Sequence, residues 1–370
     1  MPNNHDTSYS DILRYISSLQ KTNPNTVVDI ETQPDSLGRN MFRCMFLSYA
    51  ASRRAFMHSP QVIIICGNYL NWRTRSFLIV AEGIDVERQQ FPLAFGVLDG
   101  DNTSSWKWFL TKLATIFEDR PELTIFSPRF DFTLQTLSLQ FPLAEKAVCI
   151  RQLLLNIQQS YRNPEITGLV QRASYEYSKR RFLACYKEIK KMSPHCEQYL
   201  KRLGFERWSM AFSNGYRFDV YSAEVNDLRH LSRQNSIMGL LHYIHWHVSS
   251  QFTWRYGKAM EHQGYVSPYI EGLISKRTPT FDSWGFLKVS DYSCEVVNTN
   301  GESFLVDLDR KSCSCVALQK MLVPCEHSLV AAQNLGISPL TLVGSVYSTA
   351  QWLKTYSEYL QPYLKFRTMR

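Results

Sequence analysis

The stretch QVIIICGN, residues 61–68, decides the fold, because a β-branched run that ends in Gly-Asn is typical of a strand followed by a turn. Two more apolar runs of strand length follow at 75–82 and 91–98, and the short polar loops between the three predict an antiparallel meander. A helix over about 105–117 is predicted next, with N-cap candidates at 102–104. A strand at 123–127, a helix over 133–139 and a strand at 147–150 complete an α/β pattern.

Other regions flank this domain. Residues 8–60 are predicted to be helical with a polar interruption at 22–40, since Ile12, Ile16 and Leu19 have helical spacing. The sequence from 151 to about 258 also has a helical pattern, and an Asn-Gly turn at 300–301 predicts a hairpin. The predicted regions are a helical N-terminal segment (1–60), a core (61–258) with a helical insertion (about 151–215), a linker (259–285), a zinc-binding hairpin and helix (286–345) and a C-terminal tail (346–370).

Composition excludes several classes of protein. Hydrophobic residues make up 44% of the 370 residues and charged residues 20%, which is globular usage and excludes a disordered or coiled-coil chain. Because no apolar run approaches the roughly 18–20 residues of a membrane span, we expect no membrane partner. The nine cysteines, three of them within 313–325, indicate an intracellular chain with reduced thiols and one metal site.

The sharpest signal is Cys313-Ser-Cys315, followed after nine residues by Cys325-Glu-His327. Three thiols and one imidazole form a tetrahedral zinc set with no open position, so we expect one structural Zn²⁺. A helix that continues from residue 328 would place Cys325 and His327 at its N-terminus, where partial positive charge favours thiolate. The alternative is a group of buried, unligated cysteines beside an unrelated histidine.

This pattern, after a hairpin and before a helix, resembles the SWIM zinc finger of Mutator-like transposases and their domesticated plant relatives. Further blocks resemble that family in order, namely Phe91-Pro-Leu-Ala-Phe95, Ser105-Trp-Lys-Trp-Phe-Leu110, Phe141-Pro-Leu-Ala144, Cys149-Ile-Arg151, Glu206-Arg-Trp208 and Ala223-Glu-Val-Asn226. The resemblance covers roughly residues 8–365. It implies a ribonuclease H-like transposase core with a helical insertion, plus a small SWIM module.

The resemblance also assigns positions to the family's catalytic acids. Active members hold two divalent cations about 3.5–4 Å apart with an Asp-Asp-Glu set. Here the two Asp positions are Cys66 and Pro128, and only the glutamate is retained, as Glu224. Because one carboxylate cannot hold two magnesium ions, neither Mg²⁺ binding nor strand cleavage is expected. The alternative is a displaced site that uses Asp99, Asp101 or Asp131.

The net charge of +8 is concentrated in one segment, since 151–211 holds 12 Lys and Arg against five Asp and Glu. In the resembled family this helical insertion lies near DNA, so we expect non-specific DNA contacts. A solvated helix face is the alternative. The residues expected at DNA are Lys179, Arg180, Arg181, Lys187, Lys190 and Lys191. The helical face expected to pack against the fold is Phe182, Leu183, Tyr186, Ile189 and Met192.

These observations lead to one hypothesis and two alternatives. The hypothesis is a domesticated or decayed relative of Mutator-like transposases that binds zinc, lacks catalytic activity and associates with DNA or chromatin in the nucleus. The first alternative is an active DDE-type transposase or nuclease. The second is a protein-interaction adaptor whose SWIM finger binds a protein partner.

Overall fold

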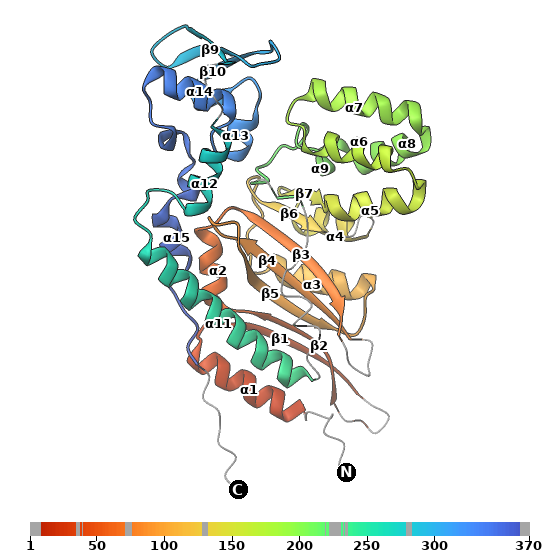
Figure 1. Ribbon diagram of the computed structural model, residues 1–370. Helices are drawn as coiled ribbons and strands as arrows, with labels where there is room; N and C mark the ends of the chain where they lie inside the picture. The colour runs from red at the N-terminus through yellow and green to blue at the C-terminus, as the bar shows by residue number, and fades with distance from the viewer. Residues whose placement is uncertain are drawn as a thin grey trace.

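A seven-stranded mixed sheet forms the centre of the computed structural model (Figure 1). The structure describes residues 9–34, 38, 40–70, 76–127, 132–218, 220–221, 231, 233, 236–278 and 283–362. The strands are β1 (Val27–Pro34), β2 (Asn40–Ser48), β3 (Val62–Tyr69), β4 (Phe77–Ile84), β5 (Gln90–Leu98), β6 (Thr124–Ser127) and β7 (Glu145–Val148). Their order is β1-β2-β5-β4-β3-β6-β7. The predicted meander is confirmed, because β3, β4 and β5 pair antiparallel, while β6 and β7 continue the sheet in parallel.

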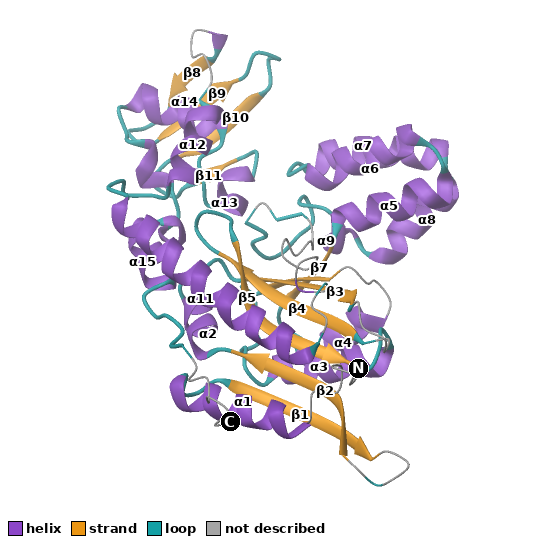
Figure 2. Cartoon of the chain, turned by 60° about the horizontal axis from the view of Figure 1, so that its bottom comes forward, coloured by secondary structure: helices purple, strands orange, loops and turns teal. Residues whose placement is uncertain are grey.

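Helices cover both faces of this sheet (Figures 1 and 2). On one face, α1 (Tyr9–Thr22) and α11 (Ile237–Glu261) lie together, and the Tyr15 hydroxyl donates to the Leu241 carbonyl at 3.2 Å. On the other, α3 (Thr103–Ala114) places Phe109 against Phe46, with ring centroids 5.5 Å apart. Gly96 makes this approach possible, since a Cβ there would lie 2.5 Å from the Phe109 ring. The helices α2 (Ala50–Met57) and α4 (Phe132–Gln140) complete the layers.

The segment from Ile150 to Trp208 is helical, as its sequence pattern predicts, and forms a bundle with its own core. Its helices are α5 (Ile150–Tyr161), α6 (Pro164–Tyr175), α7 (Lys179–Met192), α8 (Pro194–Leu203) and α9 (Phe205–Trp208). Phe182 lies at the centre of this bundle, with the rings of Phe205, Trp208 and Phe212 all within 5.2 Å of its own. Polar side chains cap α6, α7 and α8, as the Ser178 hydroxyl does for α7 by accepting from the Arg181 amide.

A second sheet forms the C-terminal module, in the order β11-β10-β9-β8. The predicted hairpin corresponds to β9 and β10, and Gly301 in its turn has a φ of 75°. The elements from residue 268 onward are α12 (Pro268–Arg277), β8 (Gly285–Lys288), β9 (Ser293–Val297), β10 (Ser303–Asp307), β11 (Ser312–Cys313), α13 (Ala317–Met321), α14 (Glu326–Leu335), the 3₁₀ helices η2 (Pro339–Leu342) and η3 (Ser345–Tyr347), and α15 (Thr349–Thr355).

Three of the expected regions differ from the structure. The N-terminal segment 1–60 is not simply helical, because β1 and β2 add two strands to the main sheet. The expected linker 259–285 contains α12, whose Ile270 is fully buried and whose Tyr269 amide donates to Glu87 at 2.8 Å. The expected tail 346–370 contains α15, and Trp352 and Tyr356 belong to the main hydrophobic core.

Candidate metal centre and nucleic-acid interface

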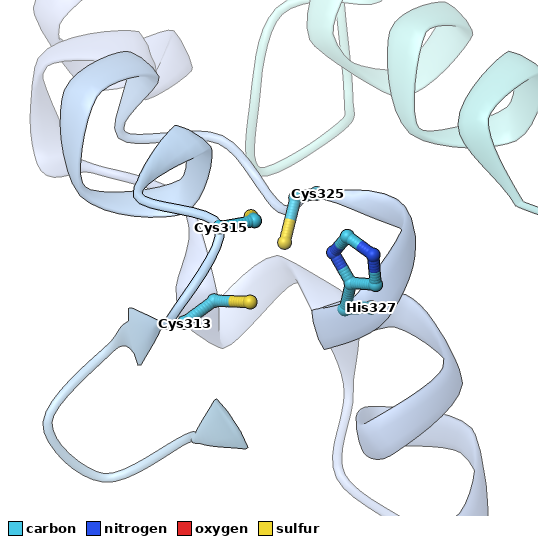
Figure 3. A group of neighbouring side chains, drawn as sticks. All are labelled: Cys313, Cys315, Cys325 and His327. Carbon is cyan, nitrogen blue, oxygen red and sulfur yellow. The ribbon is translucent and has the colours of Figure 1, made fainter. Parts of the chain in front are cut away.

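The four predicted zinc ligands converge in the C-terminal module (Figure 3). One ligand atom from each of Cys313, Cys315, Cys325 and His327 lies within 4.8 Å of the others. A tetrahedral zinc with Zn–S bonds of about 2.3 Å has sulfurs about 3.8 Å apart, so the cluster has the right size. Among the described residues, this is the one group of three or more Cys, His, Asp or Glu side chains that could hold a metal ion.

Local backbone structure explains why these ligands meet. Cys313 ends β11, and Val316, in the left-handed region with a φ of 68°, turns the chain back so that its amide donates to the Cys313 carbonyl. Gln319 clamps this turn, since its Nε2 donates to the Cys313 carbonyl at 3.0 Å and its Oε1 accepts from the Cys313 amide at 3.2 Å. Cys325 is the N-cap of α14, so the positive end of that helix faces its sulfur.

The imidazole of His327 is held by two aromatic rings. Phe304 of β10 stacks on it with centroids 3.7 Å apart, and Trp284 contacts it edge-on at 5.6 Å. Its Nδ1 is buried and has no hydrogen-bond partner among the described residues. A buried nitrogen without a partner is costly, and a metal bond would satisfy it. The sequence reasoning missed Gln319, Phe304 and Trp284, because no spacing rule marks residues that position a ligand.

The three thiols lie close enough together to share protons. Hydrogen bonds from Cys313 and Cys315 hold the pKa of the Cys325 thiol below its usual value. The pKa of the Cys313 thiol is raised instead, by its hydrogen bonds with Cys315 and Cys325 and by burial. A divalent cation would replace the shared protons and balance the thiolate charge. The donor set and its burial therefore fit a metal ion and are compatible with one zinc site.

The structure describes one of the three positions matched to catalytic acids. Cys66 is a half-buried residue near the end of β3, paired with Val80 of β4. Pro128, Glu224 and Asp131 lie outside the described residues. The other candidate acids are already engaged, since Asp99 accepts from Arg43 at 3.1 Å and from Ser105 at 2.9 Å, and Asp101 accepts from the Trp106 indole at 2.9 Å.

The six cations expected at DNA are all exposed on α7. At about 100° per residue, Arg180 and Lys187 lie on the side of α7 opposite the buried Phe182 and Ile189, with Lys190 beside them. These three residues, hereafter the α7 stripe, form no ion pair with the part of the chain that the structure describes. The other cations are engaged: Lys179 lies 5.3 Å from the Phe212 ring centre, Arg181 pairs with Glu302 of the C-terminal module, and Lys191 pairs with Glu188 at 2.7 Å.

The aromatic residues of this region are mostly packing residues, as expected. Tyr186 stacks on Phe182 and donates to Glu197 at 2.8 Å, and burial raises the pKa of its phenol. The expected packing face was too wide, however, because Leu183 is 42% exposed and Met192 is 38% exposed. Leu183 lies between Lys187 and Lys190 around the helix, and Met192 is the last residue of α7, so only the central positions are buried.

Comparison with known proteins agrees with part of this description. No curated protein matches the sequence. None of the helices in the described ranges has the length and apolarity that crossing a membrane requires. Residues 62–156 match the model of the MULE transposase domain, a segment that runs from β3 into α5 and includes Cys66. This segment is therefore similar to the MULE transposase domain, which supports a relationship with Mutator-like transposases.

Proposed function

We propose that the chain is a domesticated or decayed relative of Mutator-like transposases that has lost strand cleavage, holds one structural zinc ion and binds DNA without sequence preference in the nucleus. The observation that carries the proposal is the similarity of residues 62–156 to the MULE transposase domain, combined with a cysteine at position 66. A transposase-like framework without its first metal-binding acid retains a means of contacting DNA but not of cutting it.

The strand order favours a ribonuclease H-like core. Within the larger sheet, β5-β4-β3-β6-β7 combines an antiparallel meander with two parallel strands. The helix α3 connects β5 to β6, and α4 connects β6 to β7. The helical insertion comes after β7. This is the arrangement that the resemblance implies. The two strands β1 and β2 extend it beyond β5.

Loss of catalysis is supported by the chemistry of the matched positions. A thiol is a soft ligand that suits magnesium poorly, and proline offers no side-chain ligand. Asp99 and Asp101 are bound to neighbouring side chains, so using them for metal would break existing hydrogen bonds. We therefore propose that Mg²⁺-dependent cleavage is absent.

The C-terminal module is proposed to be a SWIM-type zinc finger. Its hairpin, its Cys-x-Cys and Cys-x-His pairs and the helix α14 occur in the expected order. When bound, zinc would cross-link β11, the turn after it and the start of α14. Cys313, Cys315, Cys325 and His327 would hold it, leaving no position for a substrate.

DNA binding is proposed to use the α7 stripe. Arg180, Lys187 and Lys190 are exposed on one helix and form no ion pair with the acids that the structure describes. Such contacts act on phosphates and carry no sequence information. We expect affinities of about 10⁻⁴–10⁻⁶ M for any duplex at physiological salt.

Two assays on the purified full-length chain test the proposal. Fluorescence anisotropy with two duplexes of unrelated sequence should give equal affinities that fall with salt. Incubation with supercoiled plasmid and Mg²⁺ should give no nicked product. Nicking that is lost in Glu224→Ala would support the active transposase instead, and an absence of DNA binding at low salt would favour the adaptor.

A further inference from the structure

A pocket of about 800 Å³ lies between α4 of the core and the end of the helical bundle. It lies apart from the zinc ligands, and no residue of α7 is among those that line it. Pockets of roughly 300–1,000 Å³ are large enough to enclose a small molecule or several side chains of a peptide. The lining residues that matter are Leu134 and Leu139 of α4, Tyr199, Arg202 and Leu203 of α8, and Arg207 of α9.

Three leucines give the pocket an apolar part, beside the polar side chains of Gln135 and Ser138. Leu134 and Leu203 are buried, whereas Leu139 is 78% exposed at the rim. Leu143, four residues further along the chain, is also 60% exposed. Single exposed leucines are ordinary on a protein surface, but exposed leucines beside a hollow with an apolar floor are typical of a binding site.

The charged part of the lining is entirely basic. Arg202 and Arg207 both line the pocket, and none of the described lining residues is acidic. The acid nearest to Arg207 is the exposed Glu206, 3.8 Å away, and such a surface pair contributes little. A third cation, Lys146, is close: burial lowers its pKa, the Asp119 carboxylate raises it, and the charge of Arg207 lowers it. Carboxylates from a partner would relieve this crowding of positive charge.

We infer that this pocket is a docking site for a short acidic segment of a protein partner, in which one large apolar side chain is flanked by Asp or Glu. The apolar side chain would fill the space over Leu134 and Leu203, and the carboxylates would pair with Arg202 and Arg207. A DNA backbone fits less well, because it would meet the guanidinium groups but leave the apolar floor unfilled. The inference does not depend on DNA binding by the α7 stripe.

Selection from a random peptide library displayed on phage, with the purified full-length chain as bait, tests this inference. We expect enrichment of peptides that contain Phe, Trp or Leu with at least two acids nearby. A labelled copy of the most enriched peptide should bind about tenfold more weakly to Arg202→Glu/Arg207→Glu, as expected from reversing two attractive charges. Leu139→Asp should also weaken binding, and its exposed position makes it safe for the fold.

The matched control is Lys187→Glu/Lys190→Glu, which makes the same change of charge on α7 and should leave peptide affinity unchanged. The inference would be overturned if no acidic and apolar peptides were enriched, or if the control weakened binding as much as the pocket variant. It would also be overturned if the pocket variant lost affinity for duplex DNA but not for peptide, since the pocket would then belong to the DNA interface.

Discussion

Replacing the α7 stripe tests the DNA interface most directly. The triple variant Arg180→Ala, Lys187→Ala, Lys190→Ala removes three exposed cations that form no ion pair with a described acid. Each phosphate contact on a duplex contributes about −0.9 to the log–log slope of affinity against salt, so three contacts contribute about −2.7. Between about 50 and 200 mM salt, the parent should therefore lose about 40-fold more affinity than the variant.

The measurement is fluorescence anisotropy with a labelled duplex at several salt concentrations, repeated with a second duplex of unrelated sequence. Both duplexes should give the same change, because phosphate contacts are independent of sequence. The fold should be unaffected, since alanine favours a helix and exposed substitutions usually change stability by less than about 0.5 kcal/mol. Circular dichroism of the variant checks this.

A matched control removes the same amount of charge elsewhere. Lys21, Lys107 and Lys354 are exposed on α1, α3 and α15, so their triple replacement by alanine also lowers the net charge by three. We expect the salt slope of this control to equal that of the parent. If the control flattens the slope as much as the stripe variant, total charge rather than α7 governs binding. If neither variant changes the slope, the stripe is only a solvated helix face.

The other predictions concern the metal and the fold. Metal analysis of the parent should find one zinc per chain, and His327→Ala should lose it; a variant that retains full zinc would contradict the ligand assignment. Zinc retention during dialysis should weaken as pH falls, because protons compete for the thiolates; retention independent of pH would argue against thiolate ligands. Glu145→Ala should lower the free energy of unfolding in urea by about 3–5 kcal/mol, because it leaves the 2%-exposed Arg217 side chain buried without its 2.8 Å partner. Glu118→Ala, in an exposed pair with Arg120, is the control and should change it little.

Features that depend on local sequence were predicted well. The four residues of the Cys/His cluster lie within fifteen positions, and the turn, the strand and the helix that bring them together are adjacent along the chain. The β3–β4–β5 meander was likewise predictable, because short loops force neighbouring strands to pair. In both cases, the contacts that fix the structure join residues that are close in sequence.

Features that depend on distant contacts were missed. In β2, residues 44–47 are all buried because β1 and β5 flank the strand and helices cover the sheet, so the sequence lacks the alternation that marks a half-exposed strand. Pro268 suggested a linker, but it occupies the first turn of α12, where proline is favoured. The buried Tyr356 has hydrogen-bond partners about 100 or more residues away, Arg255 and Asp85.

The C-terminal module is better regarded as part of the molecule's framework than as an independent appendage. Met321 and Val323, between the two ligand pairs, share a hydrophobic cluster with Val62 and Ile64 of β3. Lys320 donates to the Ser213 carbonyl, and Arg181 of α7 pairs with Glu302 in the hairpin turn. Because the module contacts both the sheet and the helical bundle, a metal that rigidifies it would also restrain the helix that carries the α7 stripe. Zinc would then contribute to DNA binding by fixing the position of that helix, without touching DNA.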